Sequence, residues 1–216
     1  MENTHSKSID RTAYILACDV QSARTVHCIN VLDRVGFSDI IPCPIIPHTS
    51  VPISNRMGMQ SIYDRILKSG DEWAYVFEDD IETLTDIKID EIVQYEEISK
   101  NHFFYLGCCG TGPNNTKPTN IKINNNTVYQ VNWSNIRGLH AIGVSRQGIE
   151  TINKYIDKYS TSIPYLDALL GRITEDIPTN LVRADLVSPY WKDHKGAFFQ
   201  DRKKFPSQWE TTNWNL

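Results

Sequence analysis

The amino-acid sequence predicts an α/β fold in which helices flank a central, mostly parallel sheet. Short apolar runs of strand length alternate along the chain with segments whose apolar residues recur at helical spacing. The first such unit is strand–helix–strand, the arrangement that builds a parallel sheet with crossover helices. A length of 216 residues suits one domain with a substantial core. We therefore expect residues 1–216 to form a single domain.

The first elements form that strand–helix–strand unit. Residues 13–18 (AYILAC) are an apolar run that predicts a buried strand. Residues 22–35 carry apolar side chains at helical spacing, with Ser22 as the capping residue and Gly36 as the stop. Residues 39–43 predict a second short strand, which is ended by proline.

The next helix and strand lead to an acidic triplet. A helix capped by Ser54 is expected to end at Gly70, and residues 73–77 (WAYVF) predict a buried strand. Glu78, Asp79 and Asp80 follow at the carboxyl end of that strand. In open α/β sheets, ligands bind outside the carboxyl ends of the strands.

The rest of the chain predicts further helices and strands around two segments without periodicity. The expected helices are 90–99, 145–159 and 165–173, and the expected strands are 103–106, 128–132, 139–144 and 181–186. Residues 1–11 are polar, and we expect them to be flexible. Residues 107–126 are rich in Gly, Asn, Thr and Pro, so we expect a mobile loop that acts as a lid over a ligand.

Composition and charge exclude some classes of function. The net charge is −4 and no basic block is present, which argues against a nucleic-acid-binding protein. No apolar run approaches the length of a membrane span, and the polar start predicts no signal peptide. Five cysteines without a CxxC pair indicate free thiols in a reducing compartment. We therefore expect a cytoplasmic protein, in the host cytoplasm if its source is viral.

The acidic triplet suggests a metal-diphosphate site. Adjacent carboxylates on a rigid strand end are costly unless a positive charge lies between them. Mg²⁺ or Mn²⁺ prefers carboxylate and phosphate oxygens, and it usually takes only one or two protein carboxylates together with substrate phosphates. The alternative is a solvated acidic turn after the strand.

Three segments resemble glycosyltransferase family 25. The first is residues 54–81, SNRMGMQSIYDRILKSGDEWAYVFEDDI, which is similar to that family's helix, strand and acidic triplet. The second is residues 137–148, RGLHAIGVSRQG, and the third is residues 163–170, IPYLDALL. The chain is also similar to the N-terminal glycosyltransferase domain of chlorella-virus proteins that build the capsid glycan, including the AYILACDV start.

The resemblance implies a GT-A fold, which is Rossmann-like, and a nucleotide-sugar donor. The expected donor is UDP-glucose, UDP-galactose or UDP-rhamnose, and the expected cofactor is Mn²⁺ or Mg²⁺. The acceptor would be a hydroxyl of a glycan or glycoprotein, reached by a single displacement with inversion. By the general GT-A pattern, Asp80 would bind the metal with help from Asp79, and Glu78 would contact the ribose. His194 resembles the histidine that serves as a further metal ligand in several GT-A enzymes.

Other residues are candidates for donor, acceptor and proton transfer. Asp167 is the expected catalytic base, with Asp185 and Asp193 as rivals, although a first-turn aspartate is also favoured by the helix dipole. The expected donor contacts are Ala17, Asp19, Arg24, Arg56, Glu78, Asp79 and Lys195. The expected acceptor contacts are His140, Tyr190 and Trp191, with Trp133 and Trp209 as further sugar-stacking candidates. For each, an ordinary surface or core role is the alternative.

Two other functions fit parts of the sequence. A nucleotidyltransferase would use the same metal-diphosphate chemistry, but the loop ACDVQSART after the first strand lacks the expected glycines. A non-catalytic glycan-binding module would need neither metal nor nucleotide.

Overall fold

The computed structural model describes residues 9–100, 102–110, 115–131 and 136–206. The N-terminal part contains β1 (Thr12–Ala17), α1 (Ala23–Val35), β2 (Asp39–Pro44), α2 (Val51–Ser69), β3 (Trp73–Glu78), β4 (Ile81–Thr83), α3 (Ile89–Ile92) and α4 (Gln94–Ser99). The C-terminal part contains β5 (Phe103–Cys109), β6 (Thr116–Ile123), β7 (Asn126–Val131), β8 (Arg137–Ser145), α5 (Arg146–Tyr159), α6 (Leu166–Asp176), β9 (Thr179–Leu181), β10 (Lys195–Gly196) and β11 (Phe198–Gln200).

The central sheet is mixed. Within the described residues its order is β2-β1-β3-β8-β5-β9-β7-β6, with β10 beside β5. Strands β1, β2, β3, β5, β6 and β9 run in one direction, whereas β7, β8 and β10 run in the other. The α/β class is confirmed, and most strands share one direction. Because β8 and β7 are inserted between parallel neighbours, however, antiparallel pairing is more extensive than the sequence predicted.

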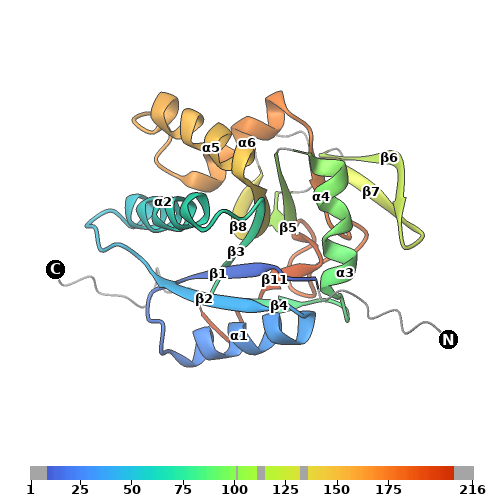
Figure 1. Ribbon diagram of the computed structural model, residues 1–216, viewed down its shortest axis with the longest axis horizontal. Helices are drawn as coiled ribbons and strands as arrows, with labels where there is room; N and C mark the ends of the chain where they lie inside the picture. The colour runs from blue at the N-terminus through green and yellow to red at the C-terminus, as the bar shows by residue number, and fades with distance from the viewer. Residues whose placement is uncertain (1–8, 101, 111–114, 132–135, 207–216) are drawn as a thin grey trace.

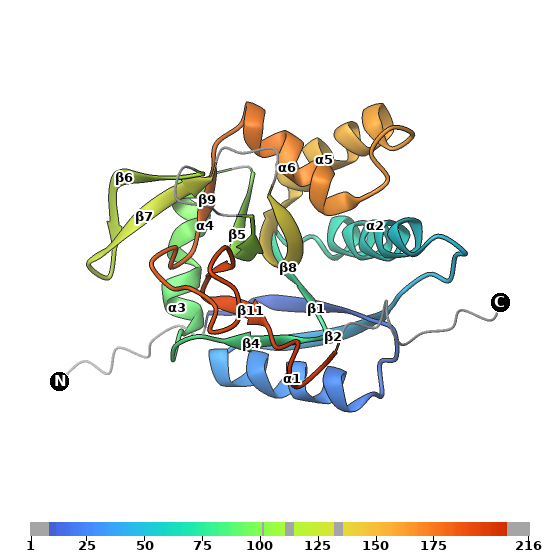
Figure 2. The same ribbon diagram turned by 180° about the vertical axis from the view of Figure 1, so that it is seen from behind.

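Helices cover both faces of this sheet (Figures 1 and 2). On one face, α2, α5 and α6 pack apolar residues such as Ile62, Ile152 and Leu169 against the strands. On the other face, α1, α3 and α4 contribute Leu32, Ile92 and others to a second core. Strands β4 and β11 form a small separate sheet next to this second core.

The helix boundaries follow local sequence signals in most places. The Ser22 side chain accepts a hydrogen bond from Thr25 N, and Gly36 ends α1 in the left-handed conformation. Gly70 ends α2 in the same way. Helix α2, however, begins at Val51 rather than at Ser54, because Pro52 suits the first turn of a helix. Ser54 is buried inside the helix and donates to the Ile46 carbonyl.

The expected lid over residues 107–126 is instead largely a β-hairpin. Strands β6 and β7 pair on either side of Asn124 and Asn125, which have positive φ angles of 47° and 66°. Two consecutive residues of this kind form the two-residue turn that suits the twist of a hairpin. The hairpin lies at the opposite end of the sheet from β1 and β3 (Figure 1). Residues 111–114, also part of the expected lid, are outside the described residues.

Residues 1–11 were predicted to be flexible, and no segment was predicted to span a membrane. Residues 1–8 are outside it, but Arg11 is held by Glu96, with a distance of 2.7 Å between Arg11 Nη2 and Glu96 Oε2. Among the described residues, every helix is too short or too polar to cross a membrane.

Candidate functional site

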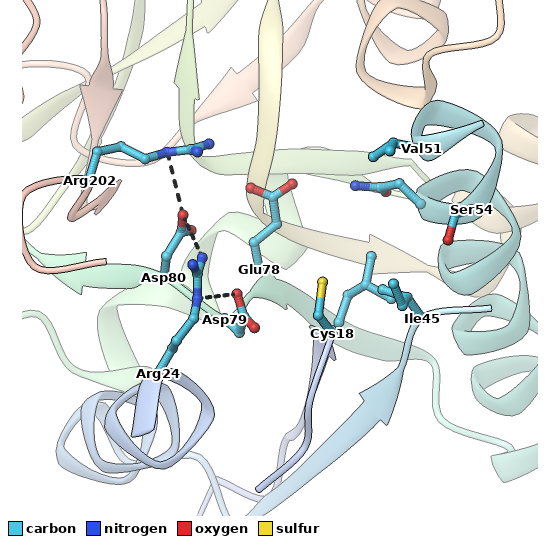
Figure 3. A pocket seen from close by; sticks show the side chains of 11 residues that line it. Cys18, Arg24, Ile45, Val51, Ser54, Glu78, Asp79, Asp80 and Arg202 are labelled. Carbon is cyan, nitrogen blue, oxygen red and sulfur yellow. Dashed lines mark hydrogen bonds and ion pairs between the residues drawn. The ribbon is translucent and has the colours of Figure 1, made fainter. Parts of the chain in front are cut away.

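A pocket opens where β1 and β3 end, beside the start of α2 (Figure 3). Its cavity volume is about 80 Å³, and the pocket is partly open to solvent. Its lining combines apolar groups with a charged floor: Leu16, Cys18, Arg24, Ile45, Val51, Ser54, Asn55, Glu78, Asp79, Asp80 and Arg202. The predicted position of a ligand site, at the carboxyl ends of the strands, agrees with this pocket.

The acidic triplet forms the floor because β3 is anchored on both sides. Phe77 pairs with Ile15 of β1 and with Ala141 of β8, and Glu78 is in register with Leu16. The chain turns immediately after β3, so Asp79 and Asp80 are carried into the protein, with exposures of 5% and 2%. Rigid pairing of the strand therefore holds three carboxyl groups together at one edge of the sheet.

Two arginines from distant parts of the sequence neutralise part of this charge. Arg24, in the first turn of α1, lies 2.9 Å from Asp79 Oδ1 through Nε and 3.0 Å from Asp80 Oδ2 through Nη2. Arg202, which follows β11, lies 3.4 Å from the same Asp80 oxygen through Nε. Figure 3 shows both guanidinium groups directed at Asp80 from opposite sides.

Three carboxyl groups against two guanidinium groups leave the cluster short of positive charge. Burial, reinforced by the neighbouring Asp80, raises the pKa of Glu78 to about 8. Burial also raises the pKa of Asp79 to about 6, even though Arg24 opposes it. The pKa of Asp80 is raised for the same reason, against the effect of Arg202 and Arg24. Asp79 Oδ2 is buried and has no hydrogen-bond partner among the described residues.

The segment after β10 closes over the triplet. Gln200 donates through Nε2 to Glu78 and, at 3.4 Å, to Asp80 Oδ1. The Asp201 backbone N donates to the Asp80 carbonyl at 2.8 Å. Sequence reasoning missed Gln200 and Arg202, because this tail has no apolar period. The pairing of β11 with β4 places them beside the triplet, and that pairing is visible only in the structure.

Asp167, the predicted base, lies at the same edge of the sheet as the triplet. Its Oδ2 accepts from Gly138 N at 3.1 Å and its Oδ1 accepts from Ala168 N at 2.7 Å. Strand β8 runs opposite to β3, so Gly138, the second residue of β8, lies beside the ends of β3 and β5. The Asp167 carboxylate is near enough to contribute to the raised pKa of Glu78.

The two rival bases are less well placed. Asp185 forms a two-point interaction with Arg183, at 3.0 Å through Nε and 2.9 Å through Nη2, which lowers its pKa. Asp193 is exposed and lies 4.0 Å from His194. None of the three aspartates lines the pocket, but Asp167 contributes to the raised pKa of Glu78.

The predicted acceptor residues form one cluster. Trp191 stacks on His194 with ring centroids 4.7 Å apart, and His194 is stacked 6.3 Å from His140. Tyr190 contacts Trp191 edge-on at 5.7 Å. His140 is fully buried next to the Phe198 carbonyl, and burial lowers its pKa to about 3. Arg202, which depresses the pKa of both histidines, connects this cluster to the acidic pocket.

Several predicted donor contacts lie outside the pocket lining. Arg56 donates to the carbonyls of Ser160 and Pro164, at 3.2 Å and 3.4 Å, and so ties α2 to the loop before α6. Asp19 is exposed and its side chain accepts from Gln21 N. Ala17 is buried at the end of β1, where its carbonyl accepts from Ile45 N. Lys195 pairs with Cys108 in the sheet.

The predicted metal ligands are only partly brought together. Asp79 and Asp80 share the pocket floor, whereas His194 stacks between His140 and Trp191. Among the described residues, no three His, Cys, Asp or Glu side chains are arranged to hold a metal ion. The unpartnered Asp79 oxygen and the incompletely neutralised carboxyl groups nevertheless suit a hard cation that draws its remaining ligands from a diphosphate. Trp133 and Trp209 are outside the described residues.

Comparisons with known proteins identify no family for this chain. No family model matches the sequence, and no curated protein matches it. Among solved structures, the chain is similar to A197 from STIV with a TM-score of 0.41 and 13% sequence identity. That match covers 79% of this chain and 80% of A197.

Proposed function

We propose that this protein is a GT-A-type glycosyltransferase related to family 25, which moves a sugar from a UDP-sugar to a hydroxyl of a glycan or glycoprotein. The observation that carries the proposal is the buried, incompletely neutralised carboxyl cluster in a pocket at the strand ends. A structural acidic turn would be solvated, whereas Asp79 and Asp80 are buried and surrounded by cationic groups.

The donor half of the site would use the strand ends and the start of α2. Asp79 and Asp80 would hold Mn²⁺ or Mg²⁺, which supplies charge neutralisation for the diphosphate leaving group. Glu78 would accept a hydrogen bond from the donor ribose. Leu16 and Ile45 give one wall of the pocket apolar surface. A nucleoside would pack against a wall of this kind.

The acceptor half would use the beginning of β8 and α6. Asp167 would take the proton from the acceptor hydroxyl, because its carboxylate is fixed by two backbone N–H groups and is near enough to Glu78 to raise the pKa of that group. Tyr190 and Trp191 form a partly exposed aromatic surface on which a sugar ring can pack, whereas His140 is fully buried and offers no surface to an acceptor.

The test is titration calorimetry with UDP and with GDP, each with and without Mn²⁺, followed by a donor screen that detects nucleotide release. We expect UDP to bind more tightly with Mn²⁺ and one UDP-sugar to be consumed when an acceptor is present. Absence of nucleotide binding, or sugar binding that needs neither nucleotide nor metal, would contradict the transferase and favour a glycan-binding module. Release of pyrophosphate from a nucleoside triphosphate would favour a nucleotidyltransferase.

A further inference from the structure

The contacts of Arg24 and Arg202 with the acidic cluster differ in number and length. Arg24 makes the two shorter contacts with Asp79 and Asp80, donates to the Pro206 carbonyl at 3.0 Å, and is only 12% exposed. Arg202 makes one longer contact, 3.4 Å from Asp80 Oδ2, and is 30% exposed. If one guanidinium group leaves the cluster, the geometry therefore selects Arg202.

The oxygens of Asp80 are already engaged. Oδ2 faces both guanidinium groups, and Oδ1 accepts from Gln200 at 3.4 Å. A divalent cation that binds this carboxylate must share or replace one of these partners. Two cationic groups competing for one oxygen repel each other, so the more weakly held one is displaced first.

Arg202 is also positioned to receive an anion. Its contact with Asp80 is made through Nε, and Figure 3 shows the guanidinium group extending over the pocket next to Glu78. A guanidinium group has a planar set of donors that matches phosphate oxygens. A side chain displaced from Asp80 would keep that donor set inside the pocket.

From this geometry we infer that Arg202 exchanges partners, holding Asp80 when the pocket is empty and binding the diphosphate of the donor when a divalent cation takes its place on Asp80. This inference rests on the proposed function, because it assumes a diphosphate ligand. It predicts effects of opposite sign on two ligands: Arg202 opposes the binding of the cation alone and supports the binding of the cation with a diphosphate.

The experiment compares wild-type protein with Arg202→Gln. Mn²⁺ binding alone is measured from the loss of the free Mn²⁺ signal in electron paramagnetic resonance, and UDP and pyrophosphate binding are measured by calorimetry in saturating Mn²⁺. We expect Mn²⁺ alone to bind about three- to tenfold more tightly to the variant, because a competing charge is removed. UDP and pyrophosphate should bind about tenfold more weakly, the effect of losing one charge-assisted interaction.

Two further variants keep the result interpretable. Arg202→Lys retains the charge but not the planar donors, so it should keep Mn²⁺ affinity close to wild type while still weakening UDP binding. Arg172→Gln removes an arginine that pairs with Glu175 on α6, away from the pocket, and should change both affinities less than about twofold. Circular dichroism and thermal melting establish that each variant is folded.

The outcomes separate the inference from the function it rests on. If wild-type protein binds Mn²⁺ and UDP but Arg202→Gln lacks effects of opposite sign, the exchange of partners is refuted and the proposed function stands. If wild-type protein binds neither UDP nor pyrophosphate, the proposed function fails and the inference fails with it.

Discussion

Replacing Asp79 by Asn should change the stability of the protein to an extent that depends on pH. Asp79 is 5% exposed, and burial raises its pKa from an ordinary value of 3.8 to about 6 despite the attraction of Arg24. Between these two values the folded protein keeps a proton that the unfolded chain has released. The free energy of unfolding contributed by this group therefore falls as the pH rises through that interval.

The size of the effect follows from the two pKa values. A difference of one pH unit corresponds to about 1.4 kcal/mol, so ionising Asp79 in the folded protein costs about 3 kcal/mol above its folded pKa. Asparagine cannot ionise and does not bear this cost. The stability of wild type relative to Asp79→Asn should thus decline by about 3 kcal/mol between about pH 4 and about pH 7.

The measurement compares the free energies of unfolding of wild type and Asp79→Asn, because buried histidines change the stability of both proteins with pH in the opposite direction. Burial lowers the pKa of His102 to about 4 and that of His140 to about 3. Both bind fewer protons when folded, so they make the stability of either protein rise with pH up to about 6.5. Since this contribution is common to wild type and variant, it cancels in the comparison.

Urea unfolding followed by tryptophan fluorescence, at constant ionic strength and without divalent cations, measures this difference. Asp185→Asn is the matched control. Arg183 lowers the pKa of Asp185, so that carboxylate stabilises the fold above its unfolded pKa and loses this contribution as the pH falls. The stability of wild type relative to Asp185→Asn should therefore rise with pH, and this change should occur at more acidic pH than the change for Asp79→Asn. A difference for Asp79→Asn that stays constant or rises from about pH 4 to about pH 7 would refute the reasoning from burial.

Three further variants test the site and the packing around it. Asp167→Asn should leave Mn²⁺-dependent UDP binding within about twofold and lower sugar transfer by about a hundredfold or more, and undiminished transfer would place the base elsewhere. Gly107→Ala should destabilise the fold by about 1–3 kcal/mol in urea unfolding, because an added Cβ would lie 2.1 Å from the Phe198 carbonyl oxygen. Glu96→Gln should cost about 1–3 kcal/mol by removing the charge that pairs with the partly exposed Arg11, while UDP affinity stays unchanged; an equally stable variant would show that this ion pair contributes little.

Local patterns predicted the elements that carry the site. Helix α1 begins after Ser22 and ends before Gly36, and the apolar run that leads to Glu78 forms β3. Helix capping and the burial of a short apolar segment each depend on only a few neighbouring residues. The hairpin at Asn124 and Asn125 was not predicted. Its composition resembles that of a loop, and the pairing that makes it a strand pair is visible only in three dimensions.

Long-range contacts decided which candidate residues enter the pocket. Arg24 and Arg56 are similar as sequence candidates, but Arg24 meets Asp79 whereas Arg56 faces the carbonyls of Ser160 and Pro164. The helix that carries each arginine determines its direction, and helix orientation depends on which face is buried against the sheet. Local sequence does not contain that information.

By itself, the sequence determined that a strand would end in three consecutive carboxyl groups, since this depends only on an apolar run and the residues that follow it. Only the tertiary structure decided what surrounds those carboxyl groups. Arg24 comes from α1. Gln200 ends β11 and Arg202 follows it, more than a hundred residues beyond β3, yet all three side chains converge on Asp79, Asp80 or Glu78. The protonation of the acidic triplet thus depends on the pairing of β11 with β4 and on the packing of α1. Both are contacts between residues far apart in the sequence, so no local sequence pattern predicts them.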